Sequence, residues 1–184
     1  MLAQRVTEEL QLAVPRPVVD GPQLFQLVVA DRERLTRFLP WVAQTQTVQD
    51  EVAFLQMTNR HLGQGQSLNL VIWVGDTVAG MISCNRFDQA NRSADIGYWL
   101  GRPFRGRGVM TQAVRGLCTL VFQDYGMNRL VIRAAVENGA SQAVARRAGF
   151  HLEGILRQNE KLADGYHDEY LFSYLRSEWA ATRS

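Results

Sequence analysis

A short run of glycines and arginines is the part of the sequence best suited to chemistry. Residues 105–108 read Arg105-Gly106-Arg107-Gly108, and Arg102 lies just before them. Glycines allow backbone N–H groups to approach a ligand closely, and arginines add full positive charges. We therefore expect this loop to hold an anion, most simply a phosphate. Gly108 should accept no side chain, because a Cβ would stand between the backbone donors and the anion.

The residues on either side predict a strand before this loop and a helix after it. Apolar and other residues alternate from Ala94 to Leu100, and Pro103 ends the strand because proline cannot donate to a ladder. From Thr111 onward the apolar positions recur at three or four residues, with Gly126 where a left-handed cap would lie. A helix N-terminus adds unpaired donors and a partial positive charge, which also suits a phosphate.

Three glycine-loop patterns can be tested by spacing. The dinucleotide fingerprint needs a third glycine where this chain has Thr111, and the P-loop needs Lys-Ser/Thr where it has Arg107-Gly108. The third pattern, Arg/Gln-x-x-Gly-x-Gly/Ala, is the acyl-CoA loop of the GNAT superfamily of N-acetyltransferases. Residues 105–110 resemble it, with Met110 in place of the final Gly or Ala. Judged on the loop alone, an arginine-rich surface turn remains an alternative.

Three further motifs strengthen the resemblance. They are Gly97-Tyr98-Trp99-Leu100, Asn138-x-x-Ser141 and Ala148-Gly149-Phe150. Together they are similar to the RimJ/RimL-type branch of the superfamily, the ribosomal-protein N-terminal acetyltransferases, in which a bulky sixth loop residue is common. The resemblance covers roughly residues 8–178, and its motifs are specific between Ile96 and Tyr174. It implies an enzyme that uses acetyl-CoA to acetylate a primary amine and releases coenzyme A.

The resemblance also implies roles for individual residues. The cofactor-binding set would be Trp99, Leu100, Arg105, Gly106, Arg107, Gly108, Val109, Met110, Thr111, Asn138 and Ser141. Asn138 would bind the cofactor arm, and Ser141 would hydrogen-bond or protonate the leaving sulfur. Glu160 matches by position the general base proposed in this branch. The simpler alternatives are a helix cap for Asn138, a first-turn serine for Ser141 and an exposed strand carboxylate for Glu160.

Acid–base chemistry bears on the identity of the acceptor. A peptide α-amine, with a pKa of about 7.7–8.0, is partly neutral at pH 7, whereas a lysine at about 10.4 is not. A weakly perturbed Glu160 therefore suits the α-amine of a protein N-terminus. A small amine, such as a polyamine, an amino sugar or an amino-acid-like metabolite, remains the alternative acceptor. A third possibility is a non-catalytic module that binds nucleic-acid backbone through Arg102, Arg105 and Arg107, but a net charge of +2 disfavours it.

Composition sets the remaining bounds. The 184 residues predict one domain spanning 1–184, with no nucleic-acid partner required, no membrane span and no signal core. Cys84 and Cys118 match no metal or redox spacing, so we expect buried free thiols in a reducing cytoplasm and no metal. The histidines, His61, His151 and His167, receive no role. A homodimer is compatible with the sequence, which leaves the oligomeric state open.

Hydrophobic periodicity and turn residues predict the rest of the chain. We expect strands at residues 9–14, 67–74, 78–85, 94–100, 129–136, 151–162 and 166–175, and helices at 22–39, 47–61, 111–125 and 138–147. Hairpin turns are indicated at Gly75-Asp76 and Asp164-Gly165. This order predicts the α/β class with a mixed, mostly antiparallel central sheet flanked by helices, which is the GNAT acyl-CoA N-acyltransferase fold.

Overall fold

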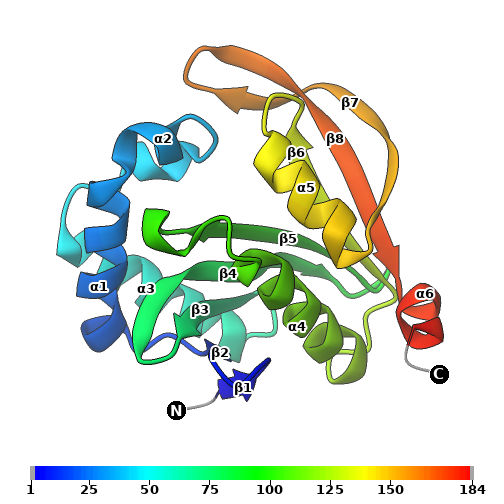
Figure 1. The fold of residues 1–184 in the computed structure, drawn as a ribbon, viewed down its shortest axis with the longest axis horizontal. Helices are drawn as coiled ribbons and strands as arrows, with labels where there is room; N and C mark the ends of the chain where they lie inside the picture. The colour runs from blue at the N-terminus through cyan, green and yellow to red at the C-terminus, as the bar shows by residue number, and fades with distance from the viewer. Residues whose placement is uncertain (1–2, 183–184) are drawn as a thin grey trace.

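The chain forms a mixed eight-stranded sheet flanked by helices (Figure 1). The computed structural model describes residues 3–182. The strands are Ala3–Arg5 (β1), Leu10–Ala13 (β2), Leu68–Val74 (β3), Thr77–Asp88 (β4), Ser93–Leu100 (β5), Arg129–Ala135 (β6), His151–Leu162 (β7) and Gly165–Leu175 (β8). The helices are Pro17–Ala30 (α1), Arg32–Thr36 (α2), Val48–Gly63 (α3), Val109–Gln123 (α4), Gly139–Ala148 (α5) and Arg176–Ala181 (α6), with 3-10 turns at Pro40–Ala43 (η1) and Arg102–Phe104 (η2).

The strand order is β1-β2-β3-β4-β5-β6-β8-β7, and every neighbouring pair except β5–β6 is antiparallel. The predicted fold class is therefore confirmed. The sequence did not predict β1 or α6, and β1 rather than β2 forms the edge of the sheet. Among residues 3–182, no helix has the length and apolar character needed to cross a membrane.

The helix predicted over 22–39 is wrong in one respect, because the structure divides this segment. α1 begins earlier, at Pro17, and ends at Ala30, where Asp31 leaves helical geometry with φ −140°. Asp31 then precedes the short α2. The apolar spacing continues across the break through Leu35, so periodicity alone could not reveal it. The predicted cap at Gly126 is also displaced, since α4 ends at Gln123 with Asp124 as its cap.

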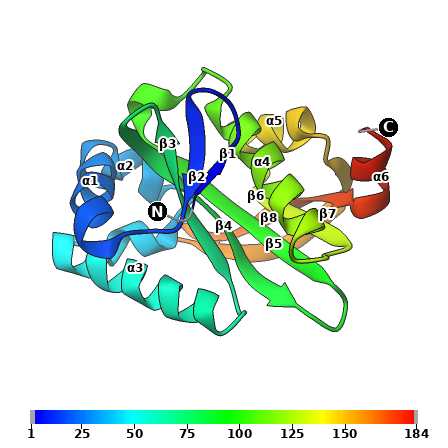
Figure 2. The ribbon, with the colours of Figure 1, turned by 90° about the horizontal axis from the view of Figure 1, so that it is seen from below.

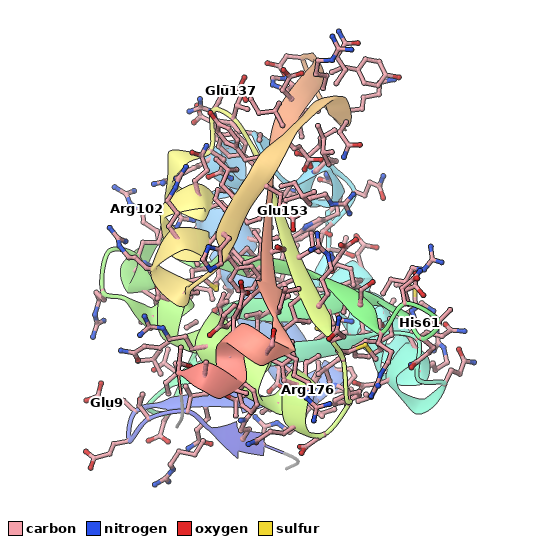
Figure 3. The ribbon with its side chains drawn as sticks, turned by 90° about the vertical axis from the view of Figure 1, so that its right-hand side faces the viewer. Glu9, His61, Arg102, Glu137, Glu153 and Arg176 are labelled. Carbon is pink, nitrogen blue, oxygen red and sulfur yellow. The ribbon has the colours of Figure 1, made fainter. Side chains whose placement is uncertain are left out.

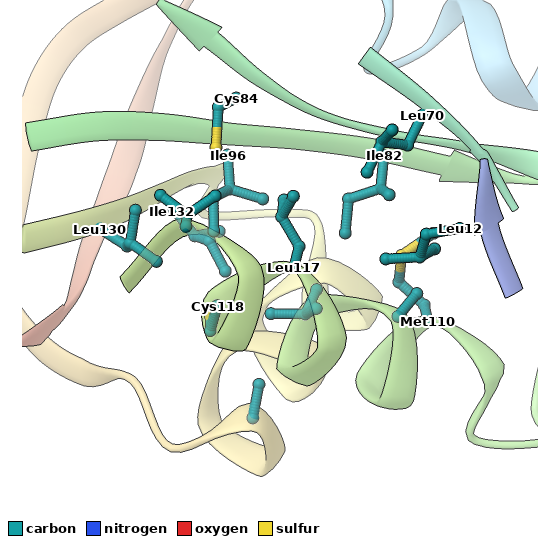
Figure 4. Close-up of a cluster of buried hydrophobic side chains, with 14 of the residues drawn as sticks. Leu12, Leu70, Ile82, Cys84, Ile96, Met110, Leu117, Cys118, Leu130 and Ile132 are labelled. Carbon is teal, nitrogen blue, oxygen red and sulfur yellow. The ribbon is translucent and has the colours of Figure 1, made fainter. Parts of the chain in front are cut away.

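Two hydrophobic clusters hold the helices on opposite faces of the sheet (Figure 2). The larger cluster packs α4 and α5 against one face and includes the buried side chains drawn in Figure 4, among them Leu117, Ile82 and Ile132. Both cysteines, Cys84 and Cys118, are buried free thiols in this cluster, as predicted. The smaller cluster packs α1, α2 and α3 against the other face. α3 begins with a capping box in which Thr47 and Asp50 bond each other's backbone N–H groups.

The sheet opens in its middle, between β5 and β6. These parallel strands pair only over Ser93–Asp95 and Arg129–Val131. Beyond those residues no ladder joins them, so the later parts of the two strands diverge. A gap of this kind exposes backbone groups and side chains from both strands to whatever occupies it. Two clefts of the described chain lie on either side of this gap.

Candidate functional site

The first cleft, which we call the loop cavity, has a volume of about 490 Å³ and lies where β5 ends and α4 begins. Its walls come from the α2 region, the end of β5, the glycine loop with the start of α4, and one face of α5. The lining residues are Arg34, Leu35, Phe38, Leu39, Tyr98, Trp99, Leu100, Phe104, Arg105, Gly106, Gly108, Val109, Met110, Thr111, Asn138, Ala140, Ser141, Ala143, Val144 and Arg147.

The glycine loop presents a row of free backbone donors to this cavity. Within the described chain, the N–H groups from Gly106 to Thr111 have no hydrogen-bond acceptor, and Gln112 is the first to bond back, to the Gly108 carbonyl at 3.1 Å. Gly108 is the N-cap of α4, where no side chain caps the helix. Unpaired donors at a helix N-terminus are an anion-binding arrangement.

The backbone conformation of Gly108 favours glycine, whereas the surrounding protein atoms leave room for a side chain. Its φ is 76°, in the left-handed region, and Gly106 has φ 73°. A Cβ built on Gly108 would meet no atom within 4 Å. The obstruction predicted from the sequence concerns the bound anion and stays a prediction. The backbone adds a second reason, because L-residues rarely adopt positive φ and a side chain at Gly108 would therefore strain the turn.

The Arg105 side chain is engaged within the protein. Its Nε and Nη2 donate to the Leu100 carbonyl at 3.0 and 2.8 Å, and Nη2 also pairs with the Asp31 carboxylate. The sequence suggested that Arg105 would add a free positive charge to the loop, but its guanidinium instead ties the loop to the α1–α2 junction. Arg102 and Arg107 are exposed, and Arg107 does not line the cavity. Two arginines that the sequence analysis did not select, Arg34 and Arg147, do line it.

Three residues stand where the loop cavity meets a second cleft. Asn138 caps α5, its Oδ1 accepting from the Ser141 N–H at 3.1 Å. Ser141, in the first turn of α5, has its Oγ 2.9 Å from the hydroxyl of Tyr98 on β5. This contact joins β5 to α5, the helix that follows β6 in the chain. Tyr98, Asn138 and Ser141 line both clefts, together with Phe38 and Leu39 from the segment after α2.

The second cleft, which we call the carboxylate cavity, has a volume of about 330 Å³. It lies on the other side of the gap, between the open strands and the β7–β8 hairpin, whose far end reaches toward α2 (Figure 1). Three acidic residues and one basic residue line it: Asp95, Glu160, Glu169 and Arg133. Arg133 is paired with Asp95 at 2.8 Å, which leaves two carboxyl groups without a basic partner in the cavity.

Glu160 and Glu169 give the carboxylate cavity its acid–base character. Glu169 is buried and accepts a hydrogen bond from Asn159 Nδ2 at 2.5 Å. The pKa of Glu160 lies above its ordinary value, because partial burial and the carboxylate of Glu169 disfavour its charged form. Arg133 and His167 oppose this rise. A carboxyl group with a raised pKa is a better proton acceptor once ionised, which suits a general base.

An irregularity in β7 delivers Glu160 to the cavity. The register of β7 against β8 shifts between Leu156 and Glu160, and Gln158 has φ 50°. The Gln158 N–H donates to Asp168 Oδ1 at 2.8 Å, which holds the bulge. Bulges of this kind redirect neighbouring side chains. The sequence placed Glu160 on a continuous strand and did not reveal the bulge.

His167 has carboxylate neighbours that the sequence did not reveal. Its Nε2 lies 2.8 Å from Asp164 at the hairpin turn, and its Nδ1 lies 3.4 Å from Glu137, which precedes Asn138 and is labelled in Figure 3. The hydrogen bond with Asp164 raises the pKa of His167 above its ordinary value. His167 therefore joins the β7–β8 hairpin to the β6–α5 loop, and its neighbour across the ladder is Glu160.

The structure brings together nearly all of the residues that the sequence analysis selected. Every predicted cofactor residue except Arg107 lines the loop cavity, and Glu160 lines the carboxylate cavity. The α2 residues, the hydroxyl of Tyr98 and Asn159 were not predicted from the sequence. Glu169 was expected only as one of several acidic residues near the last hairpin that could attract a cationic acceptor, with surface solubility as the alternative. The face of α5 could have been found from sequence, because Ala140, Val144 and Arg147 follow Asn138 at helical spacing.

The sequence and the fold of this chain resemble those of known proteins. Residues 10–151 match the family described as "Acetyltransferase (GNAT) domain". The chain is 35% identical over 169 residues to the ribosomal-protein-serine acetyltransferase of Escherichia coli, covering 92% of this chain and 94% of that one. Among solved structures it resembles RimL, a ribosomal alpha-N-protein acetyltransferase in complex with coenzyme A, with TM-score 0.91, 31% identity, and coverage of 96% and 99%. It also resembles the microcin C7 self-immunity acetyltransferase MccE in complex with acetyl-CoA and AMP, with TM-score 0.88, 32% identity, and coverage of 92% and 94%.

Proposed function

This chain belongs to the GNAT acetyltransferase family, and we propose that it transfers the acetyl group of acetyl-CoA to the α-amine of a protein N-terminus. The observation that carries the proposal is the meeting of two different clefts at one gap in the sheet. The loop cavity offers free N–H donors, and the carboxylate cavity offers two carboxyl groups without a basic partner. The relatives cover more than nine-tenths of the chain, which supports one N-acetyltransferase domain over residues 1–184.

The loop cavity fits an acyl-CoA. The N–H groups from Gly106 to Thr111 would hold the pyrophosphate, assisted by the positive end of α4. The cavity continues past Trp99 and Leu100 to Asn138, which gives the pantetheine arm a path to the gap. Because Asn138 Oδ1 is used in capping α5, the Nδ2 group is the one left to contact the arm. Arg34 and Arg147 supply positive charge at the walls of the same cavity.

The chemistry then takes place at the junction. The neutral amine attacks the thioester carbonyl from the carboxylate cavity, forming a C–N bond, and the C–S bond breaks as the tetrahedral intermediate collapses. Glu160 takes the proton that the amine nitrogen must lose, directly or through water. Ser141 donates a hydrogen bond to the departing sulfur, which finally carries a proton as free coenzyme A. The acetyl group moves from sulfur to nitrogen and, in net terms, one proton moves from nitrogen to sulfur, so the reaction balances without a further reactant.

Charge in the carboxylate cavity favours a cationic acceptor. Glu160 and Glu169 attract an ammonium group, and Glu160, once ionised, removes its proton. A peptide α-amine, with a pKa of about 7.7–8.0, gives up that proton far more readily than a lysine at about 10.4. The raised pKa of Glu160 brings it closer to that of an α-amine, which favours this acceptor over a lysine. The similarity to ribosomal-protein acetyltransferases supports the same choice.

A second acceptor class has one observation in its favour. The MccE acetyltransferase, whose structure holds acetyl-CoA and AMP, is as similar in sequence to this chain as RimL is, at 32% against 31% identity. A small amine attached to a nucleotide is therefore the competing acceptor. We place the reaction in the cytoplasm, which the free thiols of Cys84 and Cys118 suit.

An acetylation screen tests the proposal. The protein is incubated with acetyl-CoA and a panel of N-terminal peptides, polyamines, amino sugars and aminoacyl nucleotides, and thiol release is followed. Each peptide is paired with its N-terminally acetylated form, so release that depends on the α-amine is separated from hydrolysis. We expect release with free N-terminal peptides only. Release confined to a small amine would move the function to that acceptor, and release with no amine at all would contradict acetyl transfer.

A further inference from the structure

We propose that the Tyr98 hydroxyl is a positioning group for Ser141, and that through it the enzyme directs the serine hydrogen at the departing sulfur. This inference rests on the proposed function. Tyr98 lies on β5 and Ser141 on α5, on opposite sides of the gap between β5 and β6. Its hydroxyl lies 2.9 Å from Ser141 Oγ and 3.2 Å from the Ser141 carbonyl oxygen.

Packing accounts for the ring of Tyr98 but not for its hydroxyl. Ile96, Tyr98 and Leu100 alternate along β5 and contact the cluster beneath α4 and α5. A phenylalanine would fill the same space. The described hydrogen bonds of the Tyr98 hydroxyl both go to Ser141, so the group is satisfied at the junction of the two cavities and nowhere else. A polar atom placed at that junction serves the reacting centre.

The hydrogen bond between the Tyr98 and Ser141 hydroxyls can form in two arrangements, which differ in which hydroxyl donates. A serine hydroxyl has one hydrogen and two acceptor sites, and a tyrosine hydroxyl also has one hydrogen. If Ser141 donates to Tyr98, its hydrogen is used and the Tyr98 hydrogen goes to the Ser141 carbonyl oxygen. If Tyr98 donates to Ser141 Oγ, the serine hydrogen is free for another acceptor. Negative charge developing on sulfur selects the second arrangement, so the contact strengthens as the C–S bond breaks.

The position of Ser141 is fixed from two sides. Its backbone N–H donates to Asn138 Oδ1 at 3.1 Å, and its side chain meets Tyr98. Asn138 alone would fix the backbone of Ser141 and leave its χ1 rotation free. The Tyr98 contact restricts that rotation. Holding a donor in its reactive direction before the reaction lowers the reorganisation needed in the transition state.

Tyr98 orients the serine and does not supply the proton. Burial raises the pKa of Tyr98 to about 12, although its hydrogen bond with Ser141 acts in the opposite direction. A thiol has a pKa of about 8.5, so a proton would have to move uphill from Tyr98 to a thiolate. The hydroxyl therefore stays protonated and orients Ser141 through hydrogen bonding alone. Its loss should lower the rate by the same factor across the pH range.

Removing the hydroxyl alone tests the inference. Tyr98→Phe, Ser141→Ala and the double variant are compared with wild type for kcat, KM for acetyl-CoA, affinity for coenzyme A and midpoint of thermal unfolding. We expect Tyr98→Phe to lower kcat roughly 3- to 10-fold, the range for one ordinary hydrogen bond, with coenzyme A affinity within about 2-fold of wild type. In the Ser141→Ala background the same change should have no effect on kcat, because the group it positions is gone.

Tyr174→Phe is the matched control. Tyr174 is buried in the same large cluster, packs against Phe122 and Phe150, and lines neither cavity. It should leave kcat unchanged. Wild-type kcat in a folded Tyr98→Phe enzyme, or an equal loss in the Ser141→Ala background, would overturn the positioning role while leaving acetyl transfer standing. A wild-type protein that releases no thiol with any amine would instead overturn the proposed function, and this inference with it.

Discussion

The two cavities are built in different ways, although five residues line both of them. The loop cavity takes its binding groups largely from a continuous piece of chain, the backbone from Gly106 to Thr111. The carboxylate cavity takes its groups from side chains on β4, β5, β6, β7 and β8. Backbone donors are indifferent to most substitutions, whereas side chains change with every substitution. Substitutions should therefore alter the carboxylate cavity more readily than the loop cavity.

The largest effect on kcat is expected from a substitution in the carboxylate cavity, and this effect should depend on pH. Glu160→Gln should lower kcat roughly 100-fold at pH 7 if Glu160 is the proposed acceptor of the amine proton. Part of the rate should return at higher pH, where more of the amine is already neutral. Coenzyme A affinity should not change, because Glu160 does not line the loop cavity. Steady-state rates across the pH range and calorimetry with coenzyme A measure both quantities.

The control for that variant is Glu153→Gln. Glu153 lies on the same strand, is paired with Arg129 and Ser173, and lines neither cavity (Figure 3). It should leave kcat and its pH dependence unchanged. A Glu160→Gln enzyme as fast as wild type at pH 7 would remove Glu160 from the mechanism.

The next effect acts on the loop cavity alone. Gly108→Val should weaken coenzyme A binding roughly 10- to 30-fold, because a left-handed backbone costs an L-residue about 1–2 kcal/mol and a β-branched residue more. Gly108→Asn is the matched control, since asparagine tolerates positive φ and the Cβ position is open. Calorimetry on both folded variants separates conformation from bulk. Equal losses in Gly108→Asn and Gly108→Val would show that any side chain obstructs the ligand, as the sequence first suggested.

A smaller effect is expected from a substitution that alters both cavities and so raises KM for both substrates. Asp31→Ala breaks the pair between the α1–α2 junction and Arg105. The segment after α2 lines both cavities through Phe38 and Leu39, so loosening it should raise KM for acetyl-CoA and for the acceptor together. A partly buried pair contributes about 1 kcal/mol, which corresponds to roughly a 5-fold change. A change confined to one substrate would show that the two cavities are independent.

The smallest effect is a shift along the pH axis. Burial and the carboxylate of Glu169 both raise the pKa of Glu160, so Glu169→Gln should lower that pKa by removing the second cause. A lower pKa keeps Glu160 ionised to lower pH, and the acidic limb of the rate profile should therefore move to lower pH. The substituted glutamine would retain a carbonyl oxygen to accept from Asn159. An acidic limb at the same pH in wild type and Glu169→Gln would show that Glu169 does not influence the pKa of Glu160.

The same contrast explains what the sequence could predict. The strand, loop and helix from Ala94 to Thr111 combine local periodicity with a short motif, and the structure places them as expected. The cap at Asn138 is equally local. The contact of Tyr98 with Ser141, the pairing of Arg105 with Asp31 and the approach of Glu169 to Glu160 depend on where distant segments meet. Hydrophobic periodicity carries no information about contacts between distant segments. The bulge at Gln158 and the helix break at Asp31 are also not marked by typical turn residues in the sequence.

The most direct test of the account uses one peptide that contains both a free α-amine and a lysine. The peptide is incubated with acetyl-CoA and the protein at pH 7, and fragmentation in the mass spectrometer locates the acetyl group. We predict acetylation of the α-amine with the lysine left free, because the α-ammonium is the stronger acid of the two and the proposed base Glu160 should deprotonate it more readily. Acetylation of the lysine, or of neither amine while a small amine is acetylated under the same conditions, would contradict it.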